Sequence, residues 1–219
     1  MTEADRRLLA PHLVAEDLPV RRDLEKPNKR IDSVFFIETG IASVVAVQPN
    51  GGHIEIGIIG CEGVTGAAVV LGDDRTPYAT YMQVAGRGLR IGAEPLREAI
   101  RKSNSLHGIL LKSIQAFMLQ TSHTAVANAR GNIHVRLARW LLMAHDRLPD
   151  AELPLTHEFL SMMLAVRRPG VTEAINVLKR DKLIDAARGT IVVRNRKGLE
   201  KIAANFYGVP EAEYRRLMG

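Results

Sequence analysis

The chain has 219 residues, of which 46% are hydrophobic and 25% charged, and its formal net charge is +6. This length allows one large or two modest domains, and the balance of apolar and charged residues excludes a disordered chain. The charge is uneven, since residues 133–219 carry 15 Lys and Arg against 10 Asp and Glu, and residues 1–132 carry 15 against 14. A basic surplus in the C-terminal part is typical of proteins that contact phosphate.

The single cysteine, Cys61, excludes an internal disulfide and a four-cysteine metal or iron–sulfur site within one chain. No apolar run approaches the ~20 residues of a membrane span, and the N-terminal segment lacks the apolar core of a signal peptide. We therefore expect a cytoplasmic protein with no membrane partner, no metal and no cofactor.

Residues 18–92 contain short β-rich runs separated by turns. Asn50-Gly51 predicts a hairpin turn, because both residues tolerate positive φ. Several short strands at this spacing indicate a β-sandwich or β-roll. The predicted strands cover residues 34–37, 41–47, 53–59, 78–84 and 88–91.

Glycines recur at every third residue from Gly57 to Gly66. Backbone N–H groups of such a loop can cradle a phosphate; alternatively, the glycines only turn a corner of the sheet. Neither a Walker loop nor a G-x-G-x-x-G motif is present, so we do not expect nucleotide hydrolysis or Rossmann-type binding.

From Glu94 onward the pattern is helical. Apolar and then small polar residues are spaced alternately four and three apart, as in the heptad seam of a dimeric coiled coil. An apolar stripe also fits a helix packed inside its own domain, so both interpretations stay open here. The predicted seam consists of Leu110, Ile114, Phe117, Thr121 and Thr124.

A hinge is predicted at Gly131-Asn132, before a helix over residues 133–146. In that helix Arg136 and Arg139 are expected to be solvated or paired. Residues 149–154 are expected to form a loop within the second domain.

Residues 156–193 contain two short helical patterns followed by a hairpin. Thr156 is a predicted N-cap, and Pro169 fits the first turn of the second helix. Residues 183–186 and 190–193, around an Arg-Gly turn, predict a β-hairpin wing. A helix with cationic and polar side chains at its start, supported by a shorter helix, suits a DNA major groove, although a helical hairpin inside an enzyme is an alternative.

At these residues the chain resembles the Crp/Fnr superfamily of bacterial transcription regulators. The resemblance implies an α+β fold: an N-terminal β-roll of the jelly-roll, cyclic-nucleotide-binding kind, a long dimerisation helix, and a C-terminal winged helix-turn-helix. It also implies a sensor domain over residues 1–131, including a dimerisation helix over about 106–131, and a DNA-binding domain over residues 132–219.

Cyclic-nucleotide-binding members of this superfamily hold the ribose with a glutamate that follows a glycine, and the phosphate with an Arg-Ser pair. Here Ala67 stands where the glutamate is expected, and Arg75-Thr76 is the nearest match to the pair. The resemblance therefore implies a different effector, or none, in place of cyclic AMP. The effector pocket that it implies consists of Gly66, Ala67, Arg75, Thr76, Thr121 and Ser122.

We expect a homodimeric, sequence-specific regulator on a two-fold symmetric operator, with recognition helices ~34 Å apart. Arg167 and Arg168 are expected to contact base edges or phosphates, and Glu173 to accept a hydrogen bond from a cytosine amine. Because the family's Arg-Glu pair is Arg168-Pro169 here, the operator of the cyclic-AMP receptor is not expected. The predicted DNA contacts are Thr156, Arg167, Arg168, Thr172, Glu173, Asn176, Lys179, Lys182 and Arg188.

RNA polymerase is a further possible partner of such a regulator. Two other functions stay open. One is a small-molecule-binding β-roll without a DNA role. The other is a cupin-like enzyme, suggested by His53-x-Glu55, although the further histidine of such a site is not evident. The sequence contains no Ser/His/Asp constellation whose placement it supports, so we do not expect an enzyme.

Overall fold

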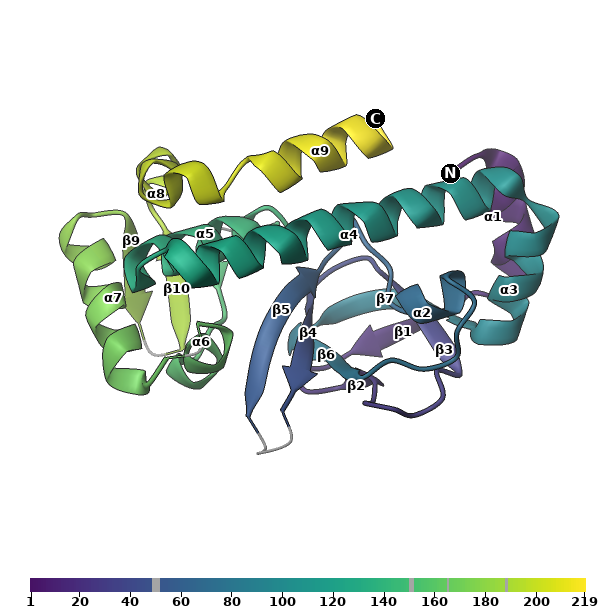
Figure 1. The fold of residues 1–219 in the computed structure, drawn as a ribbon, viewed down its shortest axis with the longest axis horizontal. Helices are drawn as coiled ribbons and strands as arrows, with labels where there is room; N and C mark the ends of the chain where they lie inside the picture. Colours follow the sequence, from purple (N-terminus) through teal and green to yellow (C-terminus); the bar gives the residue numbers. More distant parts are fainter. Residues whose placement is uncertain (49–51, 150–151, 165, 188) are drawn as a thin grey trace.

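The computed structural model describes residues 1–48, 52–149, 152–164, 166–187 and 189–219. Its N-terminal part is a β-roll made of two antiparallel sheets (Figure 1). One sheet has the order β1 (Val14–Leu18), β7 (Gly86–Gly92) and β3 (Ser33–Ile37). The other has the order β2 (Asp23–Glu25), β6 (Tyr78–Val84), β4 (Ile41–Val47) and β5 (His53–Ile59).

The predicted strands over residues 41–47, 53–59 and 78–84 are confirmed at their bounds. β1 and β2 were not predicted, because both strands are short and rich in charged residues. The charged residues are neighbours in β1 and alternate in β2. The predicted hairpin turn at Asn50-Gly51 lies outside the described residues.

Short helices close the ends of the β-roll: α1 (Glu3–Leu9), the 3₁₀ turn η1 (Ala10–His12), α2 (Ala67–Val70) and α3 (Ala93–Lys102). The Thr2 side chain caps α1. The buried carboxylate of Asp5 accepts hydrogen bonds from the hydroxyls of Ser103 and Ser105, at 2.6 and 2.8 Å. These bonds fix the N-terminal helix to the start of the long helix.

The long helix α4 (Asn104–Arg130) runs along the β-roll and onward to the C-terminal domain (Figure 1). The Ser103 hydroxyl caps its first turn by accepting from the Leu106 N–H. Further along, Gln120 makes two bonds to one residue of β5: its Oε1 accepts from the Ile58 N–H at 2.8 Å, and its Nε2 donates to the Ile58 carbonyl at 3.1 Å. The helix is therefore fixed to the sheet in position and rotation.

The C-terminal domain contains α5 (Ile133–His145), α6 (His157–Met163), α7 (Arg168–Arg180), α8 (Arg196–Ala203), η2 (Ala204–Phe206) and α9 (Val209–Met218). Its sheet has the order β8 (Glu152–Leu153), β10 (Thr190–Val193) and β9 (Ile184–Ala187). The α+β architecture with β-roll, long helix and winged helix-turn-helix is confirmed. β8 is a correction, because residues 152–153 were expected in a loop and instead pair with β10.

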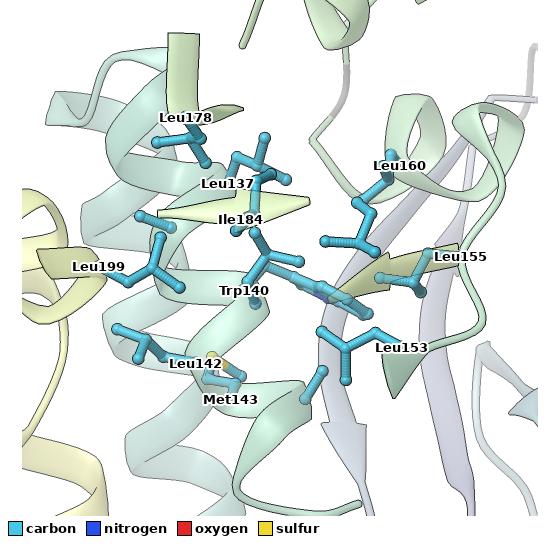
Figure 2. Packing of buried hydrophobic residues seen from close by; sticks show 14 of the residues in the cluster. Leu137, Trp140, Leu142, Met143, Leu153, Leu155, Leu160, Leu178, Ile184 and Leu199 are labelled. Carbon is cyan, nitrogen blue, oxygen red and sulfur yellow. The ribbon is translucent and has the colours of Figure 1, made fainter. Parts of the chain in front are cut away.

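One apolar core holds the helix-turn-helix together (Figure 2). Leu137 and Trp140 of α5 pack with Leu160 of α6, Leu178 of α7 and Ile184 of the wing. Ile41, Ile58 and Val84 of the β-roll belong to the same cluster. The two domains therefore share buried surface in this structure.

Arg139 corrects the expectation of a solvated or paired residue in α5, since it is 4% exposed. Its Nε donates to the Phe206 carbonyl at 2.8 Å, and a terminal guanidinium nitrogen donates to the Gln120 carbonyl at 3.3 Å. Burial lowers the pKa of Arg139 to about 10. The guanidinium donates to carbonyls from two parts of the chain and makes no ion pair with a described carboxylate.

The C-terminal helix α9 lies alongside α4 (Figure 1). Tyr214 of α9 donates its hydroxyl to the Glu62 carbonyl at 3.4 Å, which joins the end of the chain to the β-roll. Within the described ranges, no helix is both long enough and apolar enough for a membrane span.

Candidate DNA-binding surface and effector cavity

The helix-turn-helix is defined at its ends by local hydrogen bonds. The Thr156 hydroxyl accepts from the Phe159 N–H at 3.3 Å and so begins α6. Pro169 lies in the first turn of α7, where a backbone N–H would have no partner within the helix, so its absence costs no hydrogen bond. Val171, Ile175 and Leu178 of α7 are buried against the core, as predicted.

The opposite face of α7 is exposed and polar. It contains Arg168, Thr172, Glu173 and Asn176, and the exposed Arg167 directly precedes it. Arg180 continues this face one turn further on and borders the same shallow hollow as Glu173 and Asn176. Sequence reasoning missed Arg180, although its spacing of four from Asn176 places it on the same side of the helix.

The guanidinium groups at the start of α7 are available to a ligand. Arg168 is 3.8 Å from Glu158, but both side chains are about two-thirds exposed, so this ion pair is weak. Arg167 precedes the helix with an exposed side chain. Two cations beside the N-terminus of a helix, whose dipole is positive there, form a surface that attracts phosphate.

The remaining predicted contacts differ in their surroundings. Lys182 is exposed, whereas the Lys179 ammonium donates to the Ala186 carbonyl of the wing at 3.3 Å. The Thr156 hydroxyl is occupied as the cap of α6. The predicted contact Arg188 lies outside the described residues.

Most of the predicted dimer seam on α4 packs against the β-roll of the same chain. Leu110 and Ile114 are 3% and 8% exposed and belong to the core of the β-roll domain. The Phe117 ring packs over Gly57, where an added Cβ would lie 2.8 Å from the ring. These three residues therefore fit the alternative of an intramolecular stripe.

A second stripe on α4 is one residue further along and faces outward. Leu111 and Met118 are 39% and 56% exposed, and Gln115, Ser122 and Ala125 complete the spacing of four, three, four and three. Leu111 and Met118 are apolar, Ser122 and Ala125 are small, and Gln115 is polar; apolar and small side chains at heptad spacing allow two helices to approach closely. We call Leu111, Gln115, Met118, Ser122 and Ala125 the outer seam.

A cavity of about 790 Å³ lies between the β-roll, α4 and α9. Its size is within the range of small-molecule sites. Val44, Ile58 and Ile59 of the β-roll and Phe117 of α4 give it an apolar lining. Gly66, Ala67, Arg75 and Thr76 of the predicted effector pocket also line it.

Thr121 and Ser122 are not among the residues that line this cavity. Their hydroxyls donate to the Met118 carbonyl within α4, at 2.9 and 2.8 Å. The structure therefore does not bring these two residues to Arg75 and Ala67 within one chain.

A carboxylate is present beside Ala67, but it comes from another strand. Glu25 of β2 accepts hydrogen bonds from the Gly66 N–H, at 2.7 Å, and from the Thr80 hydroxyl. Burial raises the pKa of Glu25, and these two bonds partly offset the rise. Gly66 itself has φ +73°, and a Cβ there would lie 2.3 Å from a methyl group of Val34, so only glycine fits.

Two arginines that line the cavity are each paired with a carboxylate. Arg75 bonds to Asp74 at 2.9 Å, and Arg147 bonds to Glu62 at 2.6 Å with both side chains largely buried. The second carboxylate oxygen of Glu62 is buried and accepts no hydrogen bond from the described residues. This oxygen can accept a donor group of a ligand.

The His53-x-Glu55 pattern does not form a metal site. The Glu55 carboxylate accepts from the Ser43 hydroxyl and from the Trp140 indole, while His53 is exposed. Across the described ranges, no cluster of three or more His, Cys, Asp and Glu side chains has the arrangement of a metal site.

Comparison with known proteins agrees with this geometry. A sequence model of the Crp-like helix-turn-helix domain matches residues 135–202. No curated protein is similar enough to this sequence to count as a relative.

Solved structures match over almost the whole chain. A transcriptional regulator of the Crp/Fnr family from Eubacterium rectale is 15% identical with a TM-score of 0.72, covering 93% of this chain and 95% of its own. FixK2 from Bradyrhizobium japonicum is 14% identical with a TM-score of 0.74, covering 88% and 98%. CLP from Xanthomonas campestris, a global regulator that responds to c-di-GMP, is 17% identical with a TM-score of 0.68, covering 88% and 99%.

At such identities the solved structures establish the fold, and the sequence model establishes the domain that contains α6, α7 and the wing. The chain therefore contains a Crp-like helix-turn-helix domain, and its fold is that of the Crp/Fnr-family structure to which it is similar.

Proposed function

We propose that this protein binds a two-fold symmetric operator as a homodimer and reads its sequence with α7. The observation that carries the proposal is the outer face of α7. Its apolar side is buried, while its start and outer side expose two arginines and several polar side chains. An arginine side chain can donate two hydrogen bonds to one guanine base. The Glu173 carboxylate can accept a hydrogen bond from a cytosine amine.

Affinity comes from cations around this surface. Lys182 and Arg180 are exposed and border α7, and residues 133–219 carry the surplus of positive charge described above. Such contacts to phosphate fix the register of a protein on DNA without reading sequence. Arg167 and Arg168, at the start of the helix, are the readers in this proposal.

The outer seam of α4 forms the dimer interface in this proposal. An apolar heptad stripe that is exposed in one chain becomes buried when the same stripe of a second chain packs against it. Two α7 helices are then related by a two-fold axis, as a symmetric operator requires. In this proposal the protein acts in the cytoplasm, contacts RNA polymerase and has no catalytic activity.

The cavity is the effector site in this proposal, and its ligand is not cyclic AMP. Arg75 and Arg147 are already paired with carboxylates, so a cyclic phosphate would have to compete for them. Glu25 and the free oxygen of Glu62 instead favour a ligand with hydrogen-bond donors on an apolar body. Isothermal titration with cyclic AMP should show no binding at micromolar concentration; tight binding would contradict this part.

Selection of bound sequences from random duplex DNA tests the function as a whole. The full chain should enrich a palindromic sequence whose half-sites are about one helical turn, 10–10.5 base pairs, apart. Its affinity should fall steeply as salt rises, because cations displace counterions from the phosphates. Enrichment of no sequence, with binding that salt does not alter, would remove the DNA-binding role.

A further inference from the structure

A buried carboxylate lies at the junction of the β-roll and the DNA-binding domain. Glu55 of β5 is 5% exposed. The Ser43 hydroxyl of β4 donates to its Oε2 at 2.6 Å, and the Trp140 Nε1 of α5 donates to its Oε1 at 2.7 Å. One oxygen is therefore held by the β-roll and the other by the DNA-binding domain.

The surroundings of Glu55 are mostly apolar. Ile41, Ile58 and Val84 of the β-roll pack in one cluster with Trp140 and Met163 of the DNA-binding domain. A carboxylate in such a place loses the hydration that stabilises its charge. The charged form of Glu55 therefore costs free energy here that it would not cost in water.

Nearby cations offset only part of that cost. Arg139 and Arg147 favour the charged form of Glu55, but the Arg139 guanidinium bonds to carbonyls, as described above. Arg136 borders a small cavity of about 20 Å³ beside Glu55. On balance, burial raises the pKa of Glu55 to about 7, against hydrogen bonds from Ser43 and Trp140 that lower it.

The other elements packed around Glu55 add no charge near neutral pH. Tyr81 of β6 faces it, and burial, reinforced by the Glu55 charge, raises the pKa of that phenol to about 12. Thr124 of α4 and Met163 of α6, which border the same small cavity, do not titrate. Of the groups named here, Glu55 is the one whose pKa lies between 5 and 8.

The protonated form of Glu55 suits both of its partners. Its acid hydroxyl can donate to the Ser43 oxygen while its carbonyl oxygen accepts from Trp140. Both hydrogen bonds are then kept, and no charge is buried. Separation of the domains would expose Glu55 to water and return its pKa to the ordinary value of 4.5.

We propose that Glu55 and Trp140 form a clamp that holds the DNA-binding domain on the β-roll, and that the clamp is tighter when the Glu55 carboxyl is protonated. Gly131 and Asn132 form the hinge, because the backbone leaves the helical conformation at both, with ψ of 134° and 171°. Opening would change where α7 lies relative to the two-fold axis. The clamp thus regulates the proposed DNA binding, and only this last consequence rests on that function.

The direction of the pH effect follows from the two pKa values. The clamped state binds the proton more tightly than the open state, with a pKa of about 7 against 4.5. The clamp is therefore strongest below pH 4.5, weakens as pH rises up to tenfold per unit, and levels off above about pH 7. Over that window the opening equilibrium should rise by about two orders of magnitude.

Trp140 is the only tryptophan of the chain, so its fluorescence reports on the clamp directly. Titration of the full chain without DNA, from pH 5 to 8.5, should show a transition near pH 7. Glu55→Gln, a neutral residue of the same shape, should abolish it. Ser43→Ala should raise its midpoint, because a donor that lowers the Glu55 pKa is removed. Asp5→Asn, which changes a buried carboxylate far from the junction, is the matched control and should leave the transition unaltered.

Hydrogen–deuterium exchange of α5 measures opening itself. The ratio of wild-type to Glu55→Gln exchange at each pH cancels the intrinsic pH dependence. It should rise by more than about tenfold between pH 5 and 7 and then level off. A flat ratio, or a fluorescence transition that persists in Glu55→Gln, would overturn the clamp. Both measurements use protein without DNA. The clamp can therefore be disproved while the operator selection succeeds, and the clamp can be supported while the operator selection fails.

Discussion

Helix α7 of the helix-turn-helix and the long helix α4 each bury one apolar face, but their second faces differ. α7 exposes polar and cationic side chains such as Arg168 and Asn176, whereas α4 exposes the apolar side chains of Leu111 and Met118. A cationic face matches a phosphate backbone, and an exposed apolar seam matches another protein surface. The outer face of a helix, more than its buried face, therefore indicates what kind of partner it meets.

The largest expected effect separates the two faces of α4. Ile114→Asp should lower the free energy of unfolding by at least about 3 kcal/mol, because a charge would be buried in the β-roll core. Met118→Asp should leave the chain folded but monomeric, because it places a charge on the outer seam. Thermal unfolding by circular dichroism and analytical sedimentation, both on each variant, measure the two effects.

Lys112→Asp is the control for these variants, since Lys112 is exposed on α4 next to the outer seam but outside it. It should change neither stability nor assembly. A folded Met118→Asp protein that still sediments as a dimer would show that the interface lies elsewhere, and the contrast between α4 and α7 would then lose its basis.

A smaller effect is expected on the outer face of α7. Arg168→Ala should remove about 1–3 kcal/mol of discrimination at one base pair in each half-site, because a two-point contact to guanine is lost. The dimer should stay folded, since Arg168 is exposed. Sequence selection with the variant, compared with an Arg101→Ala control in the β-roll domain, tests this. If both variants select the wild-type operator with equal affinity, Arg168 reads no base.

The smallest effect is expected for Lys182→Gln. Affinity should fall by a similar factor for all sequences, and the slope of log affinity against log salt should become shallower by about one. Lys179→Gln should alter the slope less, because its ammonium already bonds to the wing carbonyl of Ala186. Fluorescence anisotropy at several salt concentrations measures both slopes. Equal slopes for wild type and Lys182→Gln would remove this lysine from the phosphate contacts.

Local signals explain why the helix-turn-helix was predictable from sequence. The cap at Thr156, the proline at residue 169 and the apolar spacing of α7 act over a few residues, and the structure reproduces each of them. α4 shows the limit of the same reasoning. It carries two stripes one residue apart, and the more apolar one, with Ile114, faces the β-roll; apolar content alone does not say which face is free.

The cavity and the clamp depend on contacts that no local pattern encodes. Glu25 meets Gly66 across 41 positions of sequence, from a strand of three residues. Trp140 meets Glu55 across 85 positions, and Arg139 finds its carbonyl 67 positions away at Phe206. In the sequence, the charged residues Glu25, Glu55 and Arg139 look like surface residues. Only the packing of distant elements buries them.

The two bonds between Gln120 and Ile58 also bear on the solubility of this protein. β5 is the edge of its sheet, and a free strand edge can pair with the strand of another molecule and start aggregation. The Gln120 amide presents the same donor and acceptor as a peptide group, and it occupies the backbone of Ile58 where a foreign strand would bind. The long helix thus protects this part of the β-roll from edge-to-edge association, whatever its part in dimerisation.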